Sequence, residues 1–126
     1  MEQKIKKLQS YIWKEIQSTL YVGQQIQIFK NENLFEIISI DDHAIQVKVL
    51  STGNTPKITK RTFDNIVKKM VEHDQVNQGK AGAQPRITLA ILKLLPFFTQ
   101  EERMVNGENK QCLVWEADFK ERLLEL

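Results

Sequence analysis

The spacing of apolar residues in the first third of the chain changes from helical to alternating. A stripe with three- and four-residue intervals comes first: Ile5, Leu8, Ile12, Ile16 and Leu20. This spacing predicts an amphipathic helix over residues 2–21, with Gly23 ending it in the left-handed conformation. Such stripes usually pack on the helix's own domain, so we expect this one to cover the core. Contact with a protein partner or a second copy is the alternative.

Strict alternation follows over residues 25–59 and predicts an antiparallel sheet. The apolar positions fall into three groups: Ile26 and Ile28; Phe35, Ile37, Ile38 and Ile40; Ile45, Val47 and Val49. Polar turn segments separate the groups, and polar side chains occupy the opposite face. This pattern is typical of a half-buried three-stranded meander. A short fourth strand over residues 56–59 is expected at the edge, where proline is tolerated.

The strand-to-helix joint at Thr59 is the clearest local signal in the chain. If Thr59 is the N-cap, Ile58 precedes it and Phe63 takes the fourth helical position, which is the spacing of a hydrophobic staple. The helix is predicted over residues 60–73. Its outer face is expected to carry an i, i+4 series of alternating charge: Lys60, Asp64, Lys68 and Glu72.

The second half contains a polar connection, a helix and a hairpin. Residues 74–86 are polar and glycine-containing, and we expect them to be mobile. A helix over 86–95, apolar nearly all round, is predicted to be buried and to stop at Pro96. A hairpin over 103–115 is expected to turn near Asn106-Gly107, and a last helix to span 116–126.

Together these elements predict one α+β domain over residues 1–126: a helix, a three- to four-stranded meander, a helix pair over 60–95, a hairpin and a last helix. Helix 60–73, helix 86–95 and the hairpin have the order of a winged-helix domain. The helix in the recognition position lacks a polar face, however. We therefore expect it in the core, with any DNA contact coming from the connection, the hairpin or Arg61.

Composition narrows the class of protein. The chain has 126 residues, 41% hydrophobic and 27% charged, which is typical of one globular domain. Its longest apolar run, residues 87–98, is interrupted and shorter than the roughly 20 residues of a membrane-spanning helix, so no membrane association is expected. A single cysteine, Cys112, and the absence of a secretion signal favour a cytoplasmic location.

Motifs for catalysis, metals and cofactors are missing or weak. His43 and His73 have no neighbours at metal-ligand spacing, and Asp41-Asp42-His43 is better interpreted as a turn. Gly79-Lys80 lacks the first glycine and the hydroxyl residue of a phosphate-binding loop. Cys112 lies in a predicted strand, where an inert thiol is expected. The sequence therefore predicts a protein without catalytic residues, metal or cofactor.

The net charge of +2 is unevenly distributed. Residues 1–47 carry 5 basic and 6 acidic side chains, residues 48–93 carry 9 and 3, and residues 94–126 carry 4 and 7. Lys60 and Lys68 each have an acidic residue four positions later. Of the other basic residues we single out five, which lie at the joint, on the helix or in the connection: Lys57, Arg61, Lys69, Lys80 and Arg86. If the joint and the connection fold together, these five form one surface for backbone phosphates. The competing interpretation is a solvated, aggregation-resistant edge strand and helix face.

The order of these segments also resembles a known group of proteins. The stretches concerned are Gly23–Phe29, Phe35–Asp42, Ile45–Val49, Ile58–Phe63 and Ile87–Pro96. Over residues 23–98 they resemble small accessory domains of bacterial restriction and mobile-element proteins, in which a β-meander leads into a helix pair. The resemblance carries over no functional residue. It implies a bacterial or phage setting and favours nucleic acid as the partner.

The function predicted from the sequence is therefore a non-enzymatic, nucleic-acid-binding accessory domain. It would use the basic surface around the strand-to-helix joint and the 74–86 connection. The alternative is a protein-interaction module, such as an inhibitor, an immunity protein or a complex subunit. That module would use the first helix or the apolar C-terminal end, residues 123–126.

Overall fold

The computed structural model describes residues 2–29, 32–80, 82 and 84–125, with the side chain of Lys80 also left undescribed. Its helices are α1 (Glu2–Thr19), α2 (Lys60–His73), the single-turn 3₁₀ helix η1 (Gln78–Lys80), α3 (Pro85–Lys93) and α4 (Phe119–Leu124). Its strands are β1 (Gln25–Gln27), β2 (Leu34–Ile40), β3 (Ala44–Val49), β4 (Lys57–Thr59), β5 (Gln75–Asn77), β6 (Phe98–Val105) and β7 (Glu108–Trp115). The predicted α+β class is confirmed.

Strands β1 to β4 form an antiparallel meander in chain order, here called the meander sheet, as predicted. Strand β4 is its edge, and proline 56 lies just before it. Strand β2 contains a bulge: Ile37 pairs with Val47, but the next pair is Ser39 with Gln46. The extra residue, Ile38, explains why apolar residues in this strand change from odd to even positions.

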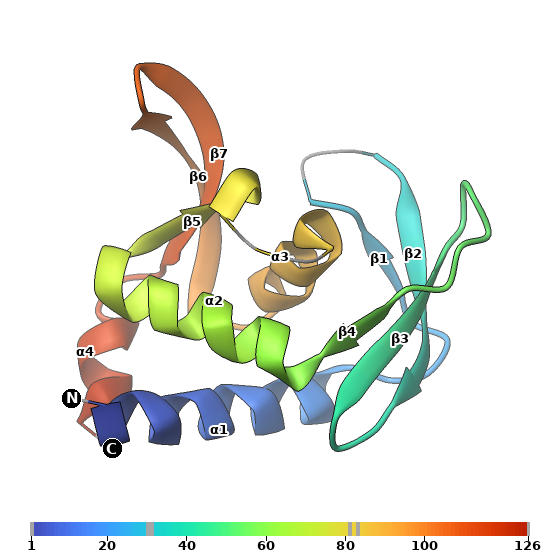
Figure 1. The fold of residues 1–126 in the computed structure, drawn as a ribbon, viewed down its shortest axis with the longest axis horizontal. Coiled ribbons are helices and arrows are strands. Elements are labelled where there is room, and N and C mark those ends of the chain that lie inside the picture. The colour runs from blue at the N-terminus through green and yellow to red at the C-terminus, as the bar shows by residue number, and fades with distance from the viewer. Residues whose placement is uncertain (1, 30–31, 81, 83, 126) are drawn as a thin grey trace.

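Strands β5, β6 and β7 form a second antiparallel sheet, the hairpin sheet, in the order β5-β7-β6. The turn between β6 and β7 lies at Asn106 and Gly107, both with positive φ, as their sequence predicts. The distal half of this hairpin extends past β5 and projects from the body of the molecule (Figure 1).

The structure corrects several predicted boundaries. The first helix ends at Thr19, and Gly23, with φ of +93°, lies in the turn into β1 instead of capping the helix. The 74–86 connection contains β5 and η1, and the hairpin begins at Phe98 instead of residue 103. The last helix starts only at Phe119, because Ala117 has φ of +50° and interrupts a right-handed helix.

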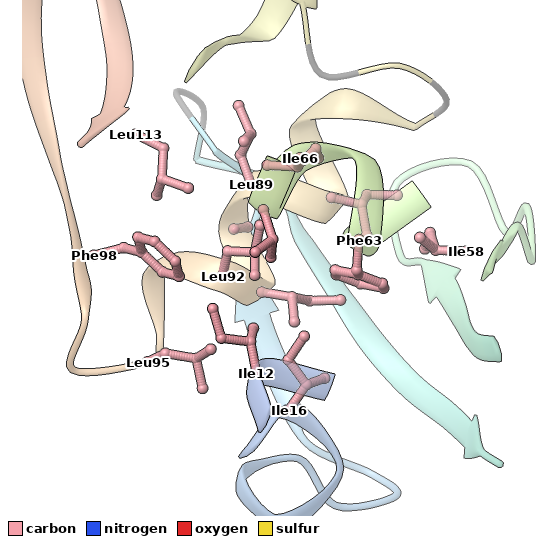
Figure 2. Packing of buried hydrophobic residues seen from close by; sticks show 14 of the residues in the cluster. Ile12, Ile16, Ile58, Phe63, Ile66, Leu89, Leu92, Leu95, Phe98 and Leu113 are labelled. Carbon is pink, nitrogen blue, oxygen red and sulfur yellow. The ribbon is translucent and has the colours of Figure 1, made fainter. Parts of the chain in front are cut away.

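One hydrophobic cluster joins the two sheets and the helices. Leu89 and Leu92 of α3 lie in its middle, between Phe63 and Ile66 on one side and Leu113 of β7 on the other (Figure 2). Six consecutive α3 residues, Ile87–Leu92, are buried. The prediction of a buried helix is therefore correct.

The second half has the connectivity of a winged helix, with α2, β5, η1, α3 and the β6–β7 hairpin in that order. Helix α3 holds the recognition position, but the meander sheet covers it from the other side (Figure 1). The main-chain N–H of Phe29 donates to the carbonyl oxygen of Arg86 at 3.2 Å, which fixes this contact. Helix α3 therefore packs against both the meander sheet and the hairpin sheet.

Across the described residues, no helix combines the length and the apolar character that crossing a membrane requires.

Candidate nucleic-acid interface

The strand-to-helix joint forms as the sequence predicts. Thr59 has extended backbone angles, and its hydroxyl oxygen accepts a hydrogen bond from the N–H of Thr62 at 3.4 Å. Ile58 and Phe63 are both 1% exposed, as a hydrophobic staple requires. Because this joint fixes where α2 begins, it also fixes which side chains of α2 point outward.

The outer side of α2 carries three basic side chains. Arg61 and Lys68 are exposed, and Lys69 is half-buried. Lys60 is different, because its ammonium lies 2.7 Å from the carboxylate of Asp64 one turn later. Among the described residues Lys68 and Glu72 form no corresponding ion pair, so the predicted alternating series is formed in its first half only.

Helix α1 extends this surface, which sequence reasoning did not identify. The two helices lie antiparallel and side by side (Figure 1), and the side-chain amide of Gln9 donates to the main-chain oxygen of Asp64 at 2.8 Å. A hollow of about 360 Å³ lies between them, bordered by Lys6 on α1 and by Lys68 and Glu72 on α2. The signal for this side was present in the sequence, since Lys6 lies off the apolar stripe. Its position beside α2 depended on packing.

The two helices concentrate positive charge. Together α1 and α2 contain eight lysine or arginine residues and four acidic residues, a net charge of +4. The whole chain carries only +2, so the remainder is net negative. We call the outward-facing cations at this helix pair, Lys6, Arg61, Lys68 and Lys69, the helical basic face.

Lys57 lies beyond the start of α2, on edge strand β4 and opposite Gln46. Its charge reaches the turn between β2 and β3, where the pKa of Asp41 lies below its ordinary value. The main cause is hydrogen bonding from the N–H groups of His43 and Ala44 to the Asp41 carboxylate, at 2.7 and 2.8 Å. The positive charges of His43 and Lys57 lower this pKa further. Lys57 itself is exposed at this edge of the meander sheet.

Arg86 and Lys69 approach the end of β5 from opposite sides. Asn77 borders a hollow of about 390 Å³ with Lys69 and His73, and another of about 460 Å³ with Arg86 and Lys110. Asn77 itself is 8% exposed, and its side-chain oxygen accepts from the N–H of Gly79 at 2.8 Å. This bond folds the start of the 74–86 segment back against the hairpin sheet.

The five residues predicted from the sequence therefore do not form one compact cluster. Arg61 and Lys69 share α2, roughly 12 Å apart along the helix axis. Arg86 lies across Asn77 from Lys69, in a hollow that also contains the carboxylate of Glu108. Lys57 lies at the opposite end of α2. The main chain of Lys80 belongs to η1, but its side chain lies outside the described part of the chain.

Within the described residues, no group of three histidine, cysteine, aspartate or glutamate side chains is placed to hold a metal ion. His43 lies in the β2–β3 turn and His73 at the end of α2. Cys112 is buried on β7, with its sulfur 3.7 Å from the main-chain oxygen of Lys110.

Comparison of this chain with family models, with curated proteins and with solved structures found no match in any of the three.

Proposed function

We propose that this chain is a non-enzymatic nucleic-acid-binding accessory domain that contacts backbone phosphates through the helical basic face. The observation that carries the proposal is the charge of the α1–α2 pair, +4 in a chain of +2. A surface with such an excess attracts a polyanion, and each neutralised phosphate releases condensed counterions.

The geometry favours some predicted contacts over others. Arg61 and Lys68 are exposed on α2, and Lys6 lies across the groove from Lys68. Arg86 is a secondary contact, because it lies away from the helix pair, in the hollow beside η1 and β7. Lys57 also ranks lower, because it lies on β4 and not on the helix pair. The proposed contact set is therefore the helical basic face, with Arg86 at its margin.

The two surfaces predicted for a protein partner have less support, because their apolar side chains pack on the chain's own core. The apolar stripe of α1, including Ile5, Ile12 and Ile16, is buried in the chain's own core. Leu123 and Leu124 of α4 also pack against that core. A partner protein would therefore have to bind elsewhere, for example at the exposed apolar side chains of Tyr21 and Val22.

The test is binding of a fluorescein-labelled 20-base-pair duplex, followed by fluorescence anisotropy at 50 and 200 mM salt. We expect affinity to fall as salt rises, and the double reversal Arg61→Glu with Lys69→Glu to weaken binding by about tenfold or more. The matched control is Lys48→Glu with Lys93→Glu, which changes the net charge equally at two exposed positions outside α1 and α2.

Circular dichroism and size-exclusion chromatography establish that each variant is folded before it is compared. Binding that is insensitive to salt would contradict the proposal. So would an equal loss of affinity in the α2 variant and the control, because total charge and not this face would then be responsible.

A further inference from the structure

We infer that the nucleic acid held at the helical basic face is a duplex, bound through its phosphates without discrimination of base sequence. This inference rests on the proposed function and specifies its substrate class. Three observations support it. Helix α3 is covered, and the hairpin carries more acidic than basic residues. Among the described residues, the α1–α2 face has no exposed aromatic side chain.

The helix in the recognition position of a winged-helix domain is covered here. Recognition of base edges in the major groove needs an exposed helix or ribbon carrying side chains such as arginine, asparagine or glutamine. Helix α3 presents Arg86 and Lys93 as its exposed residues, whereas Ile87–Leu92 are buried. The bond from Phe29 to the Arg86 carbonyl joins α3 to the meander sheet. Helix α3 therefore has no free face to insert into a groove.

The projecting hairpin has the wrong charge for a wing that contacts DNA. Over residues 98–115 it carries three glutamates and two basic residues. One of the two, Arg103, lies 2.9 Å from the carboxylate of Glu101 and is thereby neutralised. The other, Lys110, borders the hollow that contains Glu108. The hairpin would repel phosphates or leave them unbound. It would therefore not approach the duplex, and base contacts from it are not expected.

The α1–α2 face lacks the side chains that hold single strands. Single-stranded nucleic acid is bound largely by stacking of bases on aromatic rings, worth about 1–3 kcal/mol per base. The exposed positions of both helices contain no aromatic residue in the described part of the chain. Tyr21, which is largely exposed, lies in the turn after α1. Bases brought to this face would find no stacking partner.

A duplex suits the arrangement of cations on two helices. Lys6 and Lys68 border the groove between α1 and α2, together with Glu2 and Glu72. Duplex DNA presents one charge per about 1.7 Å of its axis, a higher density than a single strand. This charge density favours the duplex.

The experiment compares three labelled probes at 50 mM salt: two 20-base-pair duplexes of unrelated sequence and equal composition, and one strand of the first. We expect the two duplexes to have dissociation constants within about twofold of each other. We expect the single strand to bind about fivefold more weakly or worse. The full chain is used throughout.

The outcomes separate the two proposals. A tenfold preference for one duplex, or tighter binding of the single strand, would overturn this inference and leave nucleic-acid binding in place. Absence of salt-dependent binding to all three probes would overturn both. In a second measurement, Arg61→Gln should weaken binding of both duplexes by the same factor, since a phosphate contact carries no base preference; a loss confined to one duplex would overturn the inference.

Discussion

The indole N–H of Trp115 donates a hydrogen bond to the main-chain carbonyl oxygen of Met70, at 2.8 Å and 45 residues apart in the chain. The same oxygen accepts from the N–H of Asp74, which closes α2 in the left-handed conformation. Trp115 also packs on Phe98, with ring centroids 4.9 Å apart. This contact attaches the C-terminal end of α2, next to Lys69, to the hairpin sheet.

Replacing Trp115 with Phe should lower the free energy of unfolding by about 1 kcal/mol. The ring contact with Phe98 is largely retained, and the Met70 oxygen keeps its bond from Asp74, so the loss stays small. Trp115→Ala should cost about 3 kcal/mol or more, because it also removes the packed ring. Urea denaturation measures both variants. Equal costs for Phe and Ala would show that the indole ring contributes nothing through packing.

Removing the helix cap should have a clear, local effect. Thr59→Ala deletes the oxygen that accepts from Thr62, and should destabilise the chain by about 1 kcal/mol. Thr59→Ser keeps that acceptor and should cost much less. The unfolding midpoint in urea is compared for the two variants. If serine is as destabilising as alanine, the hydroxyl does not cap α2.

The hairpin turn should tolerate change with little effect on the core. Gly107 has φ of +81° and no atom within 4 Å of an added Cβ, so Gly107→Ala is disfavoured by the backbone alone, by about 1 kcal/mol. The distal hairpin extends past β5, so it should open locally. Hydrogen exchange should become faster at residues 101–111 and stay unchanged in α3. Faster exchange in α3 would mean that the hairpin and the core unfold together.

Much of this fold was predictable because the signals were local. The staple at Ile58 and Phe63, the Asn106-Gly107 turn and the apolar α3 each depend on a few neighbouring residues. Strand β5 was missed because Gln75, Val76 and Asn77 contain a single apolar side chain, and they form a strand only through pairing with β7. The last helix was predicted, but its start was placed too early, because the positive φ of Ala117 leaves no trace in the apolar spacing.

The basic surface was less predictable than the fold. Arg61 and Lys69 could be identified because one helix carries them. Lys6 was not included, since its position beside Lys68 follows from how α1 packs on α2 and not from their sequences. The sequence likewise did not place Glu108 in the same hollow as Arg86, because that arrangement depends on folding.

The Asp41 turn should make stability depend on acidic pH. The pKa of Asp41 is lowered in the folded chain, so its charge stabilises the fold above the unfolded pKa, about 4. That stabilisation is lost as pH falls through the lowered folded pKa. Asp41→Asn removes the titrating group, so its stability relative to the parent should rise as pH falls from 7 to 2.5. Urea midpoints at both pH values measure this difference. A difference that stays constant would show that the pKa of Asp41 is the same in the folded and the unfolded chain.

Neutralising Arg61 should reduce the salt dependence of binding by the amount expected for one phosphate contact. On a duplex, log K falls with log salt with a slope of about −0.9 for each phosphate contact. If the four cations of the helical basic face each contact one phosphate, the parent slope is roughly −3.6. Arg61→Gln should reduce its magnitude by about 0.9, whereas Arg61→Lys should leave it unchanged. Lys48→Gln, on the meander sheet, is the neutralising control and should keep the parent slope. A slope unaffected by Arg61→Gln would remove Arg61 from the interface.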